Sequence, residues 1–299
     1  MQRAVAAKIE TALAEAKGAR VCIAVNMPTG AGKSEVAVGL GLWAATEEKR
    51  AYITVPNGDL LNQYLRDFPG HLNALKGESS YFCPQYRQTC AKTRKIKKGQ
   101  CLTCPHRMAV GTCSRTVSVM HPLTLLSYRK RIPTPDVLII DEAHTLIDFQ
   151  LAQTRPVKLW RKDYKWPTDV ATDEELLAWI QGQPQTPTLQ GAQNLLVQRR
   201  GEVMINKGQQ EWRGKPNDCL EIRPLSARKA NPVLWANHKT RVVVLMSATL
   251  NEFTTEELGM DLHFKVVHIE CESPIPHAAR PIIVLPVANM SHQNPGRIQ

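Results

Sequence analysis

The sequence predicts an α/β protein in which a parallel β-sheet is flanked by helices. Short apolar runs of strand length recur along the chain, and several are followed by a helical pattern. A glycine-rich loop joins the first run, Val21–Val25, to a helical segment at 35–45, and the acidic pair Asp141-Glu142 directly follows the run Val137–Ile140. This order of strand, loop and helix is typical of a nucleotide-binding sheet.

The glycine-rich loop has the residues of a phosphate-binding P-loop. Gly30 and Gly32 allow the backbone to curl so that successive N–H groups point at one spot, where the following helix adds its positive dipole end. We expect Lys33 to reach the β- and γ-phosphates of ATP and the Ser34 hydroxyl to hold Mg²⁺. Met27 departs from the usual pattern, which has a glycine there, and a glycine turn with a chance lysine is the less favoured alternative. The expected nucleotide-binding residues are Pro28, Thr29, Gly30, Ala31, Gly32, Lys33 and Ser34.

The acidic pair supplies what a P-loop lacks by itself. Asp141 can hold Mg²⁺ directly or through water, while Glu142 can orient and polarise the attacking water. Both follow a buried strand, and ligands of open α/β sheets bind at the carboxyl ends of the strands. The alternative is an ordinary solvated loop. With the P-loop upstream, the pair predicts Mg²⁺-dependent nucleotide hydrolysis, with Lys33, Asp141 and Glu142 as catalytic residues.

Composition allows a sizeable core and suggests a polyanionic partner. The chain has 299 residues, 43% of them hydrophobic, a net charge of +11 and a pI near 9.4. The segment Lys76–Arg115 holds nine Lys or Arg against the single acid Glu78, which gives +8 of the +11. A well-solvated basic surface is the alternative. No run of 18 apolar residues and no signal-peptide core is present, so we expect a cytoplasmic protein without a membrane partner.

Cysteines mark an insertion in the predicted sheet. Five of the eight fall between Cys83 and Cys113, where hydrophobic periodicity is lost. Disulfides are not expected in a reducing compartment, so the cluster suggests a metal centre. Four thiolates suit a 4Fe-4S cluster or tetrahedral Zn²⁺, and the sequence alone does not separate them. Basic residues interleave with Tyr81, Phe82 and Tyr86, a combination suited to single-stranded nucleic acid.

A second insertion is expected at 151–239. It contains five of the six tryptophans and many prolines among helical stretches such as Asp173–Gln181, which Thr172 and Glu175 begin with a plausible capping box. We expect a mostly helical unit in which the tryptophans form a small core. The predicted sheet resumes in the apolar run Arg241–Met246.

The motifs and their order resemble the XPD/DinG iron-sulfur helicase family of superfamily 2, over almost the whole chain. The cysteine-rich and helical insertions stand in the family's order around these motifs. The matching segments are Pro56-Asn57 with Leu60 and Gln63 (motif Ia), Tyr81-Phe82-Cys83-Pro84 and Cys104-Pro105 (cluster segment), Asp141-Glu142-Ala143-His144 (DEAH box), Ser247-Ala248-Thr249 (SAT motif) and Ser273-Pro274.

The resemblance implies a RecA-like motor domain whose first insertion carries a 4Fe-4S cluster and whose second is an arch, with single-stranded DNA passing between them. His144, Ser247 and Thr249 would link the nucleotide state to domain movement, with His144 at the nucleotide site. The preferred cluster ligands are Cys83, Cys90, Cys101 and Cys104, with Cys113 in reserve, and Zn²⁺ is the competing metal. The expected units are 1–76, 116–150 and 240–280 for the motor domain, 77–115 for the cluster insertion, 151–239 for the arch-like insertion, and 281–299 for a tail or the start of a second motor domain.

Only 26 residues follow Ser273, too few for the second RecA-like domain that such helicases need. We therefore expect the first motor domain with both insertions, and a second polypeptide to supply the rest. The favoured function is an ATP-dependent DNA helicase or translocase of 5' to 3' polarity. The alternatives are an ATP- and DNA-binding accessory module that needs a second chain for hydrolysis, and a zinc-stabilised regulatory P-loop ATPase.

Overall fold

A computed structural model describes residues 1–96, 104–113, 117–153, 156–170, 172–199, 202–212, 215–228 and 240–272. Several sequence predictions lie outside these ranges. They are the candidate ligand Cys101, the Ser273-Pro274 match, and the segment 281–299 expected to be a tail or the start of a second motor domain.

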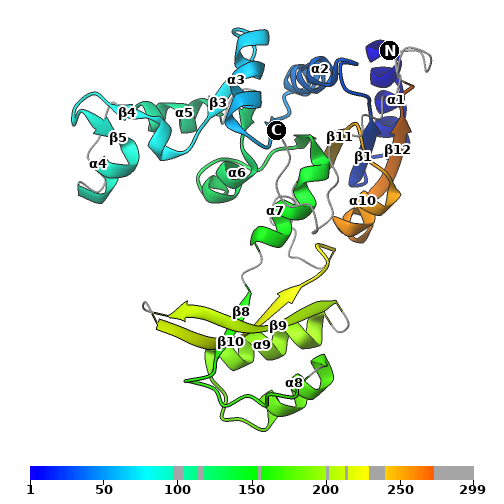
Figure 1. Cartoon of the computed structure of the whole chain (residues 1–299). Coiled ribbons are helices and arrows are strands. Elements are labelled where there is room, and N and C mark those ends of the chain that lie inside the picture. The colour runs from blue at the N-terminus through cyan, green and yellow to red at the C-terminus, as the bar shows by residue number, and fades with distance from the viewer. Residues whose placement is uncertain are drawn as a thin grey trace, which may run out of the picture.

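The fold is α/β, as predicted, and is built on a seven-stranded sheet of order β12-β1-β11-β7-β2-β6-β3 (Figure 1). Every neighbouring pair in it is parallel. The strands are β1 (Val21–Asn26), β2 (Ala51–Thr54), β3 (Asn73–Leu75), β6 (Ser118–Met120), β7 (Val137–Asp141), β11 (Val242–Ser247) and β12 (Lys265–Glu270). The predicted apolar runs Val21–Val25, Val137–Ile140 and Arg241–Met246 are thus strands β1, β7 and β11, with bounds close to those expected.

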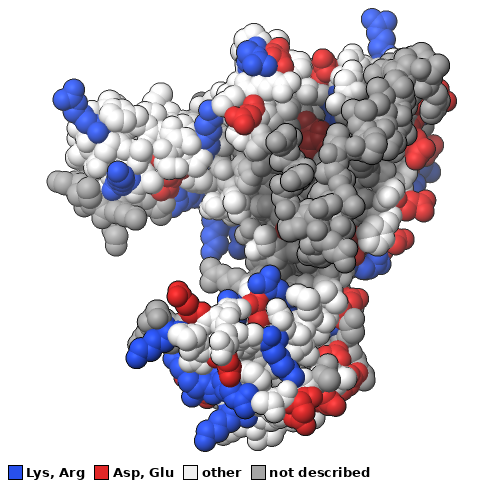
Figure 2. Space-filling model, viewed as in Figure 1, with Lys and Arg blue, Asp and Glu red and all other residues white. Residues whose placement is uncertain are grey.

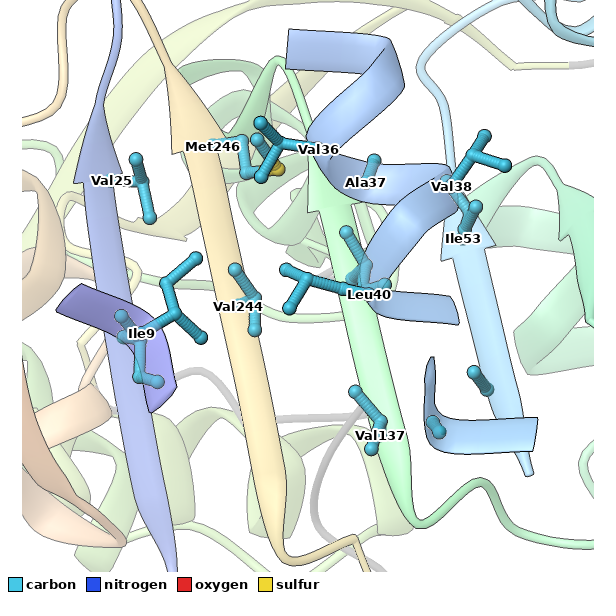
Figure 3. Close-up of a cluster of buried hydrophobic side chains, with 14 of the residues drawn as sticks. Ile9, Val25, Val36, Ala37, Val38, Leu40, Ile53, Val137, Val244 and Met246 are labelled. Atoms are coloured by element: carbon cyan, nitrogen blue, oxygen red, sulfur yellow. The ribbon is translucent and has the colours of Figure 1, made fainter. Parts of the chain in front are cut away.

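Helices cover both faces of this sheet because alternate strand residues point to opposite sides. One face packs under α1 (Gln2–Glu15), α2 (Lys33–Thr46) and α3 (Gly58–Asp67). Figure 3 shows Ile9, Val36 and Leu40 of these helices against residues of the strands. The other face packs under α5 (Pro105–Cys113), α6 (Pro122–Tyr128), α7 (Leu146–Gln153) and the residues on either side of α10 (Glu252–Glu257).

The first insertion lies between β3 and β6 and extends from the edge of the sheet (Figure 1). Its described residues form one turn of 3-10 helix, η1 (Glu78–Ser80), and an antiparallel hairpin of β4 (Phe82–Cys83) and β5 (Gln88–Thr89). Two helices follow, α4 (Cys90–Ile96) and α5.

The second insertion has its own hydrophobic core and lies between α7 and β11. We expected it to be mostly helical, and this is wrong in part, because two helices pack against a three-stranded antiparallel sheet. The strands are β8 (Val157–Trp160), β9 (Val203–Trp212) and β10 (Lys215–Pro224), and the helices are α8 (Asp173–Gln181) and α9 (Pro187–Gln198). The expected capping box of α8 is present, and Trp166 lies in the core as expected.

The hairpin β9–β10 was missed because most of its described side chains in β9 are exposed, and the strand is rich in Gln, Lys and Glu. A strand with few buried residues carries little of the apolar signal by which strands are found. Across the described ranges, no helix is long and apolar enough to span a bilayer.

Candidate active site

The predicted nucleotide site is assembled at one edge of the main sheet. Because its strands are parallel, their carboxyl ends share that edge. Strand β11 lies between β1 and β7, so Ser247 at its end stands between the P-loop after β1 and the acidic pair after β7. Three segments more than 100 residues apart in sequence therefore meet there.

The P-loop has the backbone that its glycines predict. Gly30 and Gly32 have φ of 76° and 89°, in the left-handed region, and Gly32 is the residue before α2. A Cβ at Gly32 would also meet the end of the Gln2 side chain, which is exposed and can move, so the positive φ is what favours glycine here. The Ala31 N–H donates to the Pro28 carbonyl at 3.3 Å, which closes the turn.

Met27, the departure from the usual P-loop pattern, points away from the loop. Its side chain is fully buried in the core beneath α2, and its N–H donates to the Ser247 carbonyl at 2.8 Å. The methionine therefore packs in the core and leaves the loop backbone unobstructed.

Lys33 is the first residue of α2 and is only 8% exposed. Its ammonium lies 3.5 Å from Glu142 Oε1 and donates to the Met27 carbonyl at 3.4 Å. The cation of the P-loop and the carboxylate expected to direct water are thus within reach of one another.

Asp141 is buried at the end of β7, and both carboxylate oxygens are held. Oδ2 accepts a hydrogen bond from the Tyr64 hydroxyl at 2.8 Å, and Oδ1 accepts the Glu142 N–H at 3.0 Å. Burial raises the pKa of Asp141, and the Tyr64 hydrogen bond is the largest effect that opposes this rise. Glu142 has φ of 50°, and this left-handed residue turns the chain out of the strand.

Tyr64 is a site residue that the sequence did not reveal. It is fully buried on α3, and an interaction with the Ser34 side chain opposes the rise in its pKa that burial causes, so the phenol lies near both expected Mg²⁺ ligands. The helical pattern of Leu60, Leu61 and Tyr64 marks it only as a buried position. No local signal shows that its hydroxyl faces Asp141.

His144 connects the acidic pair to β11. Its Nδ1 lies 3.4 Å from Glu142 Oε2 and 2.8 Å from Ser247 Oγ. Ser247 Oγ is in turn 3.4 Å from Thr249 Oγ1 and accepts the Thr249 N–H at 3.3 Å. The expected coupling residues therefore form one hydrogen-bonded chain.

In the first insertion, Cys90, Cys104 and His106 come together, and their ligand atoms all lie within 4.8 Å of one another. All three side chains are buried, and the two sulfur atoms are 3.5 Å apart. Cys83 is also buried, on β4, whereas Cys101 lies outside the described residues. Cys113, the reserve ligand, packs in the core of the main sheet, where burial raises its pKa.

His106 was not among the predicted ligands. Its position in the sequence could have indicated a ligand, because His106 follows Cys104 by two residues at the start of a helix. A search for cysteine ligands alone does not include it. Its ring lies between Tyr81 and Tyr128, at centroid distances of 5.2 and 5.1 Å.

The aromatic residues of this insertion differ in exposure. Tyr81 turns inward, where its hydroxyl accepts the Lys76 N–H at 2.9 Å and donates to the Ala74 carbonyl at 3.3 Å. Phe82 is 58% exposed, and Arg87 and Lys92 are exposed on the same insertion. Figure 2 shows Lys and Arg on the surfaces of both insertions.

A profile of the family described as "Type III restriction enzyme, res subunit" matches residues 1–162, which include the P-loop and the acidic pair. The chain belongs to this family. The match supports a superfamily 2 helicase domain, of the kind that hydrolyses ATP. No curated protein matches the sequence.

Three solved structures are similar to the chain at low sequence identity. "XPD_Helicase" is 15% identical, with 84% of this chain and 59% of that chain covered and a TM-score of 0.42. S. tokodaii Xpd4 is 13% identical, with 88% and 60% covered and a TM-score of 0.40. A hypothetical ATP-dependent RNA helicase from Sulfolobus tokodaii is 12% identical, with 85% and 49% covered and a TM-score of 0.38. The chain thus spans about half the length of the last of these.

Proposed function

We propose that this chain binds Mg²⁺-ATP at the carboxyl edge of its main sheet and hydrolyses it as part of a nucleic-acid helicase motor. The observation that carries the proposal is the 3.5 Å contact between Lys33 of the P-loop and Glu142 of the acidic pair. The two side chains come from loops after different strands, so a nucleotide in the P-loop would place its terminal phosphate beside a carboxylate. This is the arrangement needed for phosphoryl transfer to water.

Each residue has a role that follows from its position. The backbone of Pro28–Gly32 would surround the phosphates. Lys33 would leave Glu142 and bind the β- and γ-phosphates instead. Ser34 and Asp141 would hold Mg²⁺. Glu142, released from Lys33, would orient the attacking water.

The contacts that run from Glu142 through His144 to Ser247 and Thr249 support a coupling role. Loss of the γ-phosphate would move Glu142, and His144 would transmit this to the end of β11. Motion of β11 would then reach the neighbouring strands.

For the nucleic acid, we propose single-stranded DNA as partner and 5' to 3' polarity. The support is the excess of basic residues at 76–115, the exposed Phe82 beside exposed cations, and the likeness of the motifs to XPD/DinG helicases. The proposed units keep the expected boundaries, with motor segments at 1–76, 116–150 and 240–280. For the metal centre of 77–115, the XPD/DinG resemblance implies a 4Fe-4S cluster, whereas the Cys and His donors that lie together in the structure suit Zn²⁺.

The test is nucleotide binding and ATPase activity of the purified chain, with and without single-stranded DNA. Lys33→Ala should abolish ATP binding, and Glu142→Gln should retain binding but lose hydrolysis by at least about a hundredfold. Lys49→Ala, an exposed lysine beyond the opposite end of α2, is the matched control. Unchanged ATP binding in Lys33→Ala would refute the site.

A second candidate function is an ATP- and DNA-binding module that hydrolyses ATP only with a second polypeptide. Helicase motors commonly use an arginine from the opposite domain to stabilise transition-state charge. Within the described residues, the ion pairs of Glu142 are with Lys33 and His144, and neither is an arginine. DNA and ATP binding without hydrolysis, restored by a second chain, would select this candidate.

A further inference from the structure

We propose that Cys90, Cys104 and His106 bind a single tetrahedral divalent ion of the zinc class, with His106 as a ligand that the cysteine pattern does not contain. The proposal concerns the first insertion and does not depend on ATP hydrolysis. It chooses between the two metals that the sequence left open.

The distance between the two sulfur atoms favours one ion. Zinc holds Cys sulfur at about 2.3 Å and His nitrogen at about 2.0–2.1 Å, so two thiolates on one tetrahedral ion lie roughly 3.8 Å apart. Cys90 Sγ and Cys104 Sγ are 3.5 Å apart, close to that value. In a 4Fe-4S cluster each thiolate binds a different iron, and the cluster keeps the sulfur atoms further apart.

The helices around the site bring the donors together. Cys90 begins α4, whereas Cys104 precedes α5, with its carbonyl accepting the Met108 N–H at 3.0 Å. His106 lies in the first turn of α5.

Aromatic packing fixes His106. Its ring meets the Tyr81 ring at 63° and the Tyr128 ring at 52°, and it is only 5% exposed. Tyr81 is anchored to the backbone around β3, and Tyr128 belongs to α6 on the main sheet. An ion on His106 would therefore fasten the insertion to the motor domain.

Cys83 is the candidate fourth donor, although its sulfur is not among the ligand atoms that lie within 4.8 Å of one another. Strands β4 and β5 pair Cys83 with Gln88, and the Cys90 N–H donates to the Tyr81 carbonyl at 2.7 Å, which continues the same register. Residues 83 and 90 therefore lie on one face of the hairpin, as diagonal neighbours. Cys83 is 1% exposed, so its thiol is inside the insertion. Approach of the Cys83 thiol to the other three donors would complete a Cys₃His site.

The experiment is metal analysis of the whole chain, purified anaerobically, combined with replacement of the native ion by Co²⁺. We expect about one zinc and no acid-labile sulfide per chain, and visible bands of tetrahedral cobalt. His106→Ala should lower the metal content at least severalfold, while His106→Cys should retain the ion and shift the cobalt spectrum toward higher thiolate content. His71→Ala, an exposed histidine, and Cys219→Ser, a buried cysteine of the second insertion, are the matched controls.

The cobalt spectrum of His106→Cys separates a ligand from a packing residue, because a folded variant with an unchanged spectrum would show that residue 106 does not touch the ion. Iron with acid-labile sulfide, lost in Cys101→Ser but kept in His106→Ala, would overturn the proposal in favour of a cluster. A chain that takes up neither zinc nor cobalt would also overturn it. None of these outcomes alters the test of Lys33 and Glu142.

Discussion

Removal of the Tyr64 hydroxyl should weaken Mg²⁺ binding without emptying the nucleotide site. Tyr64→Phe keeps the buried ring on α3 but deletes the 2.8 Å hydrogen bond to Asp141. Asp141 keeps the Glu142 N–H as a donor. The variant therefore tests whether the Tyr64 hydroxyl keeps Asp141, an expected Mg²⁺ ligand, in its ionised form.

The size of the effect follows from the burial and charge of Asp141. A hydrogen bond to a charged group contributes about 1.5–3 kcal/mol, so we expect a loss of roughly 2 kcal/mol. For a domain of this size that is a fall in Tm of about 4–8 °C. Tyr52→Phe is a matched control, since Tyr52 is also fully buried but donates to the neutral Pro133 carbonyl at 3.0 Å. Its loss should be about 1 kcal/mol, with no effect on Mg²⁺.

The pH dependence has a definite sign. Burial raises the folded-state pKa of Asp141, so the stability linked to this group is present below its unfolded-state pKa and is lost as pH rises through the folded value. Tyr64→Phe removes the main opposing effect and raises that pKa further. The difference in unfolding free energy from the native protein should therefore be largest above the pKa of the variant and shrink in acid.

The assays are thermal unfolding over a range of pH, and Mg²⁺ titration of binding to a fluorescent ATP analogue. We expect Tyr64→Phe to need roughly tenfold more Mg²⁺ for half-maximal binding at neutral pH, because a tenfold change in an equilibrium constant corresponds to about 1.4 kcal/mol. Identical Mg²⁺ titrations for Tyr64→Phe and the native protein would refute the role of Tyr64. A Tm difference that does not vary with pH would refute its link to Asp141 ionisation.

Three further substitutions test the site and the fold. Met27→Gly restores the usual P-loop residue but empties a buried position, so we expect a loss of about 2–5 kcal/mol in chemical denaturation with ATP affinity kept in the folded fraction; an equally stable variant would contradict the packing role. Ser247→Ala removes the contact with His144 and should reduce DNA-stimulated ATPase more than ATP binding, and equal losses would contradict a coupling role. Thr172→Ala breaks the capping box with Glu175 and should cost about 1 kcal/mol in thermal unfolding of the second insertion, whereas Thr168→Ala, outside the box, should cost less.

Sequence predicted the main sheet well because its strands are buried on both faces. The run Val137–Ile140 is apolar throughout, and a run of this length and composition is typical of a strand inside a parallel sheet. Strand β3 and the hairpin β9–β10 were missed, because the first is only three residues long and the second exposes much of its surface.

The site was predicted in part for a related reason. The P-loop and acidic pair follow their strands directly, so local pattern marks them. Tyr64 and His106 become site residues only through folding, which brings their side chains to partners distant in sequence or turns them inward. Local pattern cannot show such contacts, because a buried helical position is compatible with many partners.

Both insertions leave the sheet and return to it at adjacent strands. The first connects β3 to β6 and the second connects β7 to β11, and each pair lies side by side in the sheet. Each insertion is therefore an enlarged crossover between parallel neighbours. The entropy of closing such a connection grows only slowly with its length. The main sheet fixes where each insertion begins and ends but not how long it is. Units of different size can therefore be exchanged at these two sites without altering the order of the strands.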